Sequence, residues 1–387
     1  MNPKPFSIFR IAAVLFLFAF MLSVNSCQKD NHSPTNRLKD FNVRMLAGNN
    51  NKYGAEHIIS TLQNAWGLAF SSGGTAWVNA QAGHVSDVMD SIGNRIPAVD
   101  PVNIPSPTNA TGGSPTGIVF NPNSDQFVIP SGDGSASQAA RFIFVGDDGV
   151  VSAWNATWGH NSYRVAANEG SYKGLTLASN NGANYLYAAN LKTGKIEVWD
   201  WTWNSVKWPG AFTDPNLPND YSPFNIQVVG DQLYVTYAKA SNGDEVKGAG
   251  LGLVDIYTTN GAFVKRFATG GTLNAPWGVA MAPLSFLNDD ENNGKGQGSV
   301  IVIGNFGDGR INAYRASDGK FIGQLSMHNM PITIDGLWAL SFAPSTSPIN
   351  PNLLYFTAGP DDEQNGLFGY ISRADKGNGN DNGNGNY

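Results

Sequence analysis

The sequence predicts an all-β protein, a six-bladed β-propeller whose blades are four-stranded antiparallel sheets. Two observations lead to this fold. Residues 274–325 contain four short apolar runs separated by Gly, Asn and Asp, which is the pattern of an antiparallel meander. One such meander cannot bury both of its faces, so further copies must pack beside it. The phrase APWGVAM, which opens this stretch, has counterparts along the whole chain.

Six related phrases mark the starts of six blades. Each phrase places a small or turn-forming residue inside an apolar run: NAWGLAF, SPTGIVF, SYKGLTL, SPFNIQV, APWGVAM and GLWALSF. We call these shared positions the anchors: Gly67, Gly117, Gly174, Asn225, Gly278 and Ala339. Their successive spacings of 50, 57, 51, 53 and 61 residues are close to the roughly 40–50 residues of a four-stranded blade.

Each anchor begins a blade whose other strands follow as apolar runs. We expect the outer strand of blade one at Arg95–Val99 and the second strand of blade two at Gln126–Ile129, with 157–167 extending blade two or replacing one of its strands. Only three runs follow the end of blade five, so Val43–Ala47 should complete the last blade as its outermost strand. That closure leaves no free sheet edge between the first and last blades.

Composition supports one folded unit and excludes one class of partner. Charged residues are 14% of the 387 residues, against about 25% in an average soluble protein, and the 45 glycines suit a protein rich in turns. The net charge of -6 comes without a basic stripe, so we expect no nucleic-acid partner. The repeat predicts a single propeller domain over residues 41–372, acting as a monomer.

The first 26 residues are typical of a lipoprotein signal peptide. Two basic residues precede the apolar segment Ile11–Leu22, as in a secretory signal. Cys27 follows LSVNS, which resembles a bacterial lipobox, and it is the chain's single cysteine. We therefore expect Cys27 to carry lipid and residues 27–40 to form a linker. The alternative is an ordinary cleaved signal with an incidental cysteine.

The residues that follow the cysteine favour the outer membrane. An acidic residue directly after the cysteine would resemble an inner-membrane retention signal, and Gln28 is not acidic. The run Gln28–Asp30 resembles a surface-export tag of lipoproteins in one group of Gram-negative bacteria. We expect an exported outer-membrane lipoprotein of a Gram-negative bacterium, facing the periplasm or the cell surface. The Gly/Asn-rich residues 373–387 are predicted to be disordered.

Four ordered segments carry a family resemblance. NAWGLAF, GAFTDPNLPNDYSPFNI, GNFGDGRINAY and IDGLWALSF resemble signature segments of an uncharacterised family of exported bacterial β-propellers, and the blades are more distantly similar to NHL-type repeats. The resemblance spans residues 41–372. It implies a six-bladed propeller and implies no activity.

Polar residues recur where the blades should meet the central channel. Loops that lead into the innermost strands and loops that join second to third strands lie on one face of a propeller. These loops and adjoining strands hold our candidate ligand-binding residues: Asn64, Trp66, Asn79, Asn190, Asn225, Asn274, Trp277, Asn305 and Asp335. Asn offers donors and an acceptor, and Trp can stack on sugar rings, so we expect a polar small molecule, a glycan or a protein partner. The alternative is that these Asn residues cap turns and bond strand ends.

The Trp-rich hairpin 199–208 is a second candidate surface. Trp199, Trp201 and Trp203 alternate and would share one face if the strand continued through them. Such a row could bind a sugar or a partner, or it could pack between neighbouring blades.

A cation and a reaction are the remaining alternatives. Asp335 with Asn225 could hold Ca²⁺ or another divalent cation, although no cofactor is required. The acidic run Asp289–Gly294 begins like a calcium loop, but its twelfth position is Val300 instead of Glu. The sequence has no Gly-x-Ser-x-Gly elbow, and its five His show no metal-ligand spacing. We therefore expect a binding module without catalytic residues. The alternative, by fold analogy, is a lactonase-like hydrolase with a cation in the channel.

Overall fold

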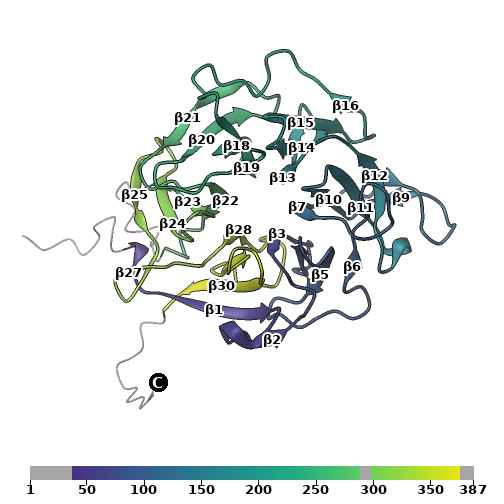
Figure 1. The fold of residues 1–387 in the computed structure, drawn as a ribbon, viewed down its shortest axis with the longest axis horizontal. Helices are drawn as coiled ribbons and strands as arrows, with labels where there is room; N and C mark the ends of the chain where they lie inside the picture. The colour runs from purple at the N-terminus through teal and green to yellow at the C-terminus, as the bar shows by residue number, and fades with distance from the viewer. Residues whose placement is uncertain (1–36, 288–297, 375–387) are drawn as a thin grey trace, which may run out of the picture.

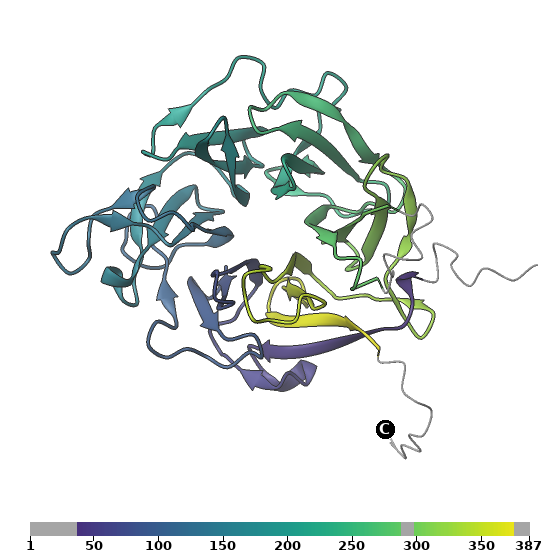
Figure 2. The ribbon, with the colours of Figure 1, turned by 180° about the vertical axis from the view of Figure 1, so that it is seen from behind.

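The computed structural model describes residues 37–287 and 298–374, in which the regular structure is almost entirely β-strand. Six antiparallel sheets stand in a ring around a central axis, and the same ring is seen from behind (Figures 1 and 2). Each sheet is a meander of four neighbouring strands, with short additions in two of them. The predicted six-bladed β-propeller is confirmed.

The blades follow one another along the chain, and each begins with its innermost strand. Blade one contains β3 (Ala65–Phe70), β4 (Ala76–Ala80), β5 (Val85–Met89) and β6 (Val102–Asn103). Blade two contains β7 (Pro115–Phe120), β10 (Phe142–Gly146), β11 (Val150–Trp154) and β12 (Tyr163–Ala167). Blade three contains β13 (Tyr172–Asn180), β14 (Ala183–Asn190), β15 (Lys195–Asp200) and β16 (Ser205–Val206).

The second half of the ring repeats this plan. Blade four contains β17 (Tyr221–Val229), β18 (Gln232–Ser241), β20 (Gly252–Thr258) and β21 (Phe263–Thr269). Blade five contains β22 (Pro276–Ala282), β23 (Val300–Asn305), β24 (Ile311–Arg315) and β25 (Phe321–Gln324). Blade six contains β28 (Leu337–Phe342), β29 (Leu354–Ala358), β30 (Leu367–Arg373) and β1 (Phe41–Gly48). The short strand β19 (Asp244–Glu245) pairs with β18 beside the channel.

The N-terminal strand closes the ring, as predicted. β1 runs antiparallel to β30, with Val43 opposite Ile371, and the purple and yellow strands lie side by side in both views (Figures 1 and 2). The fold extends slightly beyond the predicted limits of 41 and 372. Leu38 is 2% exposed within the core, and Arg373 donates a hydrogen bond of 2.8 Å to the Lys39 carbonyl. The chain ends are therefore fastened to each other through one sheet.

Two predicted strands were wrong. In blade one the predicted strand Arg95–Val99 pairs with β5 only through an isolated bridge between Arg95 and Met89. The Asp100 carboxylate then accepts the Val88 N–H at 2.6 Å, and β6 forms the outer strand. Blade two does not use Gln126–Ile129 as its second strand. That segment contributes β8 (Val128–Ile129), which forms a separate hairpin with β9 (Gln138–Ala139). The alternative segment 157–167 contains the true outer strand of blade two, β12.

The Trp-rich hairpin packs mainly between blades. β15 ends at Asp200, so the three alternating tryptophans do not form one row. Trp199 is buried, and Trp203 packs edge-to-face on Phe127 with ring centroids 5.1 Å apart. Trp201 is 42% exposed. A continuous aromatic binding surface is therefore absent from this hairpin.

Several predictions lie outside the described residues. They are the signal peptide 1–26, the lipidated Cys27, the acidic run Asp289–Gly294 and the tail from residue 375 onward. Within residues 37–287 and 298–374, no helix has the length and apolar character needed to cross a bilayer.

Candidate functional site

Each innermost strand carries a β-bulge beside its anchor. In blade three, Tyr172 pairs with Asn190 and Gly174 with Ala189, which leaves Lys173 as an extra residue. The other five inner strands show the same one-residue excess. A bulge re-aims a side chain relative to the regular pleat. The residues directly before the anchors form a buried set that we call the ring positions: Trp66, Thr116, Lys173, Phe224, Trp277 and Trp338.

Buried polar side chains of adjacent blades hold the backbone at these bulges. Asn79 donates to the Thr116 carbonyl at 2.9 Å, and Asn225 donates to the Trp277 carbonyl at 2.8 Å. Thr357 donates in the same way to the carbonyl of Trp66. Bulged carbonyls lack a ladder partner, and leaving them unpaired in the core would be costly. For Asn79 and Asn225 the structure therefore shows a role in joining blades.

Three aromatic rings stack across the channel. The Trp66 and Trp338 centroids are 3.5 Å apart, and those of Trp338 and Phe306 are 3.9 Å apart, with interplanar angles of 15° in both pairs. An ammonium group covers each end of this stack. Lys173 Nζ lies 5.3 Å from the Trp66 ring, and Lys247 Nζ lies 4.4 Å from the Phe306 ring. Both faces of Trp66 are thus occupied, so it offers no open face to a sugar ring.

Lys173 forms an ion pair with one carboxylate and interacts electrostatically with two more, from two further blades. Its Nζ lies 2.9 Å from Asp147 Oδ1, on the β10–β11 loop of blade two. Glu245 belongs to β19 of blade four, and Glu363 lies on the β29–β30 loop of blade six. Burial opposes the charge on Lys173, but Asp147 and Glu245 outweigh it and raise the lysine pKa. We call the group Lys173, Asp147, Glu245, Lys247 and Glu363 the channel mouth.

Burial also acts on the carboxylates of the channel mouth. It raises the pKa of Glu245 and of Glu363, and the nearby Lys173 charge works against both shifts. Asn64 donates to Glu363 Oε2 at 2.7 Å and accepts from Trp338 Nε1 at 2.9 Å. Asn64 therefore links the carboxylate at the surface to the aromatic stack beneath it.

A left-handed turn positions Glu363. Asp361, Asp362 and Glu363 have φ angles of 56°, 49° and 66°, a run of conformations that non-glycine residues rarely adopt. The turn is held at Asp361, whose N–H donates to Asp335 Oδ2 at 2.8 Å and whose carboxylate accepts from Lys52 at 2.6 Å. Such strain persists only where surrounding contacts enforce it, and it concentrates at functional sites.

The other predicted asparagines fasten loops to one another. Asn190 donates to Glu197 Oε1 at 2.8 Å and accepts from the Ser171 N–H at 3.2 Å. Asn274 accepts from the Gly248 N–H at 2.6 Å, and Asn305 accepts from the Asn274 N–H at 3.2 Å. These contacts match the alternative interpretation, in which Asn residues bond strand ends.

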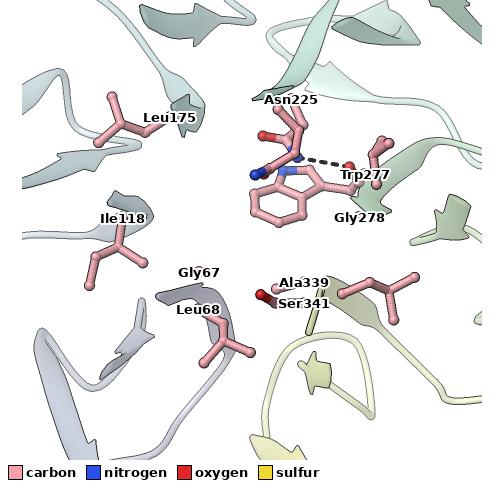
Figure 3. Close-up of a pocket in the computed structure, with 12 residues that line it drawn as sticks. Gly67, Leu68, Ile118, Leu175, Asn225, Trp277, Gly278, Ala339 and Ser341 are labelled. Carbon is pink, nitrogen blue, oxygen red and sulfur yellow. Dashed lines mark hydrogen bonds between the residues drawn. The ribbon is translucent and has the colours of Figure 1, made fainter. Parts of the chain in front are cut away.

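A small cavity lies among four of the anchors and the residues that follow the anchors in the sequence (Figure 3). Its volume is about 40 Å³, and its lining combines aliphatic side chains with the polar Asn225, Gln227 and Ser341. Asn225 and Trp277 reach it, whereas Asp335 is not among its lining residues. A buried water needs at least about 10–15 Å³ of such volume, so the cavity holds a few waters at most. The cavity is therefore too small for a ligand much larger than water.

The predicted residues converge only in part. Asn64 and Trp66 contact the channel mouth, while Asp335 is exposed and supports the turn next to it. In the part of the chain that the structure describes, no three His, Cys, Asp or Glu side chains lie close enough to hold a metal ion. The Asp335–Asn225 cation site, and the hydrolase that would use it, stay predictions.

The charged residues of the channel mouth were not predicted from the sequence. One signal could have found Lys173: it is the only charged residue at the six positions directly before the anchors. The other charged members lie on segments between the regular blade strands, and no repeat position identifies them.

The fold and this site define the class of protein: a six-bladed β-propeller with a charged channel mouth over an aromatic stack. No family model matches the sequence. The chain is 30% identical over 356 residues to "Uncharacterized protein R648" of Acanthamoeba polyphaga mimivirus, covering 88% of this chain and 82% of that protein. It is 28% identical over 351 residues to "Uncharacterized protein L690" of the same virus, covering 87% of each. The chain therefore belongs to the same family as protein R648.

Among solved structures, one titled "Streptogramin B lyase structure" aligns with a TM-score of 0.46 and 13% sequence identity. The alignment covers 86% of this chain and 98% of that one.

Proposed function

We propose that this protein is an exported, lipid-anchored β-propeller that binds a polar ligand at the channel mouth and catalyses no reaction. One observation carries the binding proposal: Lys173 is 3% exposed and pairs with Asp147 of blade two, while Glu245 of blade four and Glu363 of blade six interact electrostatically with it. Buried charges are expensive unless they are paired, so they concentrate where a protein uses them.

The hydrogen bonds that Lys173 leaves unused indicate what the ligand offers. An ammonium group has three N–H donors, and in the described chain Asp147 is the one side chain within ion-pair distance of Nζ. Glu245 and Glu363 add acceptors from blades four and six. A ligand that fits must carry acceptors and donors close together, as hydroxyl, amide and amino-acid groups do.

A thermal-shift screen of neutral sugars, sugar acids, amino acids and short peptides tests the binding proposal. Hits are then titrated by calorimetry against wild type, Glu363→Gln, Lys173→Met and the exposed control Lys192→Met. We expect binding to weaken at least about tenfold in the first two variants, since hydrogen bonds to charged groups contribute about 1.5–3 kcal/mol, and to be unchanged in the control. Glu363→Gln keeps the test decisive if Lys173→Met fails to fold. A hit that neither variant weakens overturns the proposal.

The anchoring proposal rests on the lipobox-like segment before Cys27 and on the resemblance to exported bacterial propellers. Each acyl methylene buried in a bilayer contributes about 0.8 kcal/mol, so two or more chains hold a protein stably. We expect Cys27→Ser to move the protein from the membrane fraction to the soluble fraction. Equal membrane association of variant and parent would contradict the anchor.

A further inference from the structure

The outer face of Phe306 carries an ammonium group supplied by the chain itself. Lys247 Nζ lies 4.4 Å from the ring centroid and 3.8 Å from a carboxylate oxygen of Asp362. The opposite face of Phe306 packs on Trp338, which makes the ring a rigid platform. Aromatic faces attract cations, and a carboxylate beside the ring adds to this attraction.

The two ammonium groups on the aromatic stack are held very differently. The Lys173 side chain is 4% exposed and lies 2.9 Å from Asp147. The Lys247 side chain is 44% exposed, and its partner Asp362 is 98% exposed. Exposed ion pairs and exposed cation–π contacts are both weak, so Lys247 can leave Phe306 at little cost.

The backbone around Lys247 stays in place when its side chain moves. The Gly248 N–H donates to Asn274 Oδ1 at 2.6 Å, and the Val246 N–H donates to the Lys239 carbonyl at 2.7 Å. Withdrawal of the side chain would therefore remove the ammonium group from the ring of Phe306 without moving the backbone.

Charge balance identifies what could replace Lys247. Two lysines at the mouth, Lys173 and Lys247, face a larger set of carboxylates: Asp147, Glu245, Asp362 and Glu363. Withdrawal of one lysine increases the excess of negative charge at the mouth. An incoming cation reduces this excess again, whereas a neutral ligand does not. The site already accommodates a primary ammonium on an unbranched carbon chain.

We propose that the outer face of Phe306 is an ammonium-binding site, that Lys247 fills it in the free protein, and that the ligand displaces Lys247 with its own primary ammonium group. The proposal rests on the proposed function, because it names one chemical group of the ligand bound at the same mouth. Lys247 then acts as an internal competitor that sets the affinity for amines.

Calorimetric titration with n-butylammonium, and with n-butanol as the neutral match, tests the site directly. We expect butylammonium to bind Lys247→Ala about two- to fivefold more tightly than wild type, the ratio for losing one exposed cation–π competitor. The exposed control Lys192→Ala should equal wild type. Adding Phe306→Leu to Lys247→Ala should weaken butylammonium binding about two- to fivefold, and n-butanol should bind none of these proteins. Equal amine affinity in wild type and Lys247→Ala, or equal binding of the alcohol, overturns the proposal.

A further variant guards against misfolding. If Lys247→Ala/Phe306→Leu does not fold, Lys247→Ala/Asp362→Asn replaces it, and amine affinity must fall there too. The outcome also separates this inference from the proposed function. One outcome is a neutral ligand whose affinity falls in Glu363→Gln and is unchanged in Lys247→Ala. That outcome would refute the proposed ammonium group of the ligand and support ligand binding at the channel mouth. Amine binding to Lys247→Ala, with no ligand dependent on Lys173 or Glu363, refutes the proposed function and leaves the Phe306 site standing.

Discussion

On one side of the six anchors the channel holds three tryptophans, a phenylalanine, a threonine and a lysine, while the other side holds six aliphatic residues. The aliphatic set is Leu68, Ile118, Leu175, Ile226, Val279 and Leu340. Both sets come from the same strands, two positions apart. In a regular strand such residues would share one face and experience similar surroundings.

The bulge at each anchor separates these two environments. One extra residue per inner strand breaks the two-residue period, so the ring positions turn away from the face that their neighbours keep. The aliphatic side can then pack uniformly in every blade, while the ring positions vary in chemistry. A propeller can thus keep one repeat for closure and use the adjacent position for recognition.

Among the tests of this difference between the two sides of the anchors, Trp338→Ala should have the largest effect on stability. The ring contacts Trp66 and Phe306 face to face, and its Nε1 bonds Asn64. We expect a loss of about 3–5 kcal/mol in the free energy of unfolding, measured by denaturant titration, as for other buried Trp truncations. Trp338→Phe keeps a stacked ring and should lose about 1–2 kcal/mol. A loss below about 1 kcal/mol for the alanine variant would mean that the stack is not a structural unit.

Leu340→Ala makes the matching change on the aliphatic side. Leu340 is 5% exposed and borders the 40 Å³ cavity. We expect a loss of about 2–3 kcal/mol, near the lower end for such truncations, because one side of the residue already lacks neighbours. Denaturant titration measures this loss. Ligand affinity at the mouth should not change, and a tenfold weakening would show that the two sides are coupled.

The ring architecture was predictable from the sequence because it depends on local patterns. The anchors recur at near-constant spacing, and the missing fourth strand of blade six required an N-terminal partner, which β1 supplies. The errors fell where side chains replace strand contacts. Asp100 bonds the backbone of β5, and Asn121 donates to the Ala140 carbonyl at 2.9 Å, which closes the excursion that contains β8 and β9.

The channel mouth was predictable only through Asn64 and Trp66. Lys173 lies on the inner strand of blade three, and the other charged residues come from blades two, four and six. They meet because the ring closes, which no local pattern encodes. The prediction that Trp66 could stack on a sugar ring failed to take the bulges into account. A regular pleat would leave the ring positions separate, whereas the bulged strands bring Trp66 and Trp338 into face-to-face contact.

A buried carboxylate in blade one shows how the pKa of a buried group shifts when it has few polar partners. Asp87 is 0% exposed, and its Oδ2 has no hydrogen-bond partner in the described chain, although Thr61 donates to Oδ1 at 2.6 Å. Burial raises the Asp87 pKa to about 7, Asp100 adds to the shift, and Arg95 opposes it. Lys173, by contrast, keeps its charge beside Asp147.

The pH dependence follows from that raised pKa. The folded state holds the Asp87 proton more tightly than the unfolded state, so this contribution is complete below pH 4 and is lost as pH rises towards 7. The slope is up to about 1.4 kcal/mol per pH unit. We expect Asp87→Asn to remove this component from the stability measured by denaturant titration between pH 4 and 8. An unchanged pH profile would mean that Asp87 is solvated in solution.

The smallest effect concerns the strained turn, which lies beside the charged mouth. Asp362 has φ of 49°, and its side chain makes one ion pair, at 3.8 Å with Lys247. Asp362→Gly relieves the left-handed strain but also removes the charge, so Asp362→Asn is the matched control for charge. We expect the glycine variant to exceed the asparagine variant by about 0.5–1 kcal/mol in the free energy of unfolding, since glycine adopts this conformation freely but loses more entropy on folding. Thermal and denaturant unfolding measure the difference. If the asparagine variant is the more stable one, the turn carries no strain for glycine to relieve, and the rigid placement of Glu363 must come from its bond with Asn64 alone.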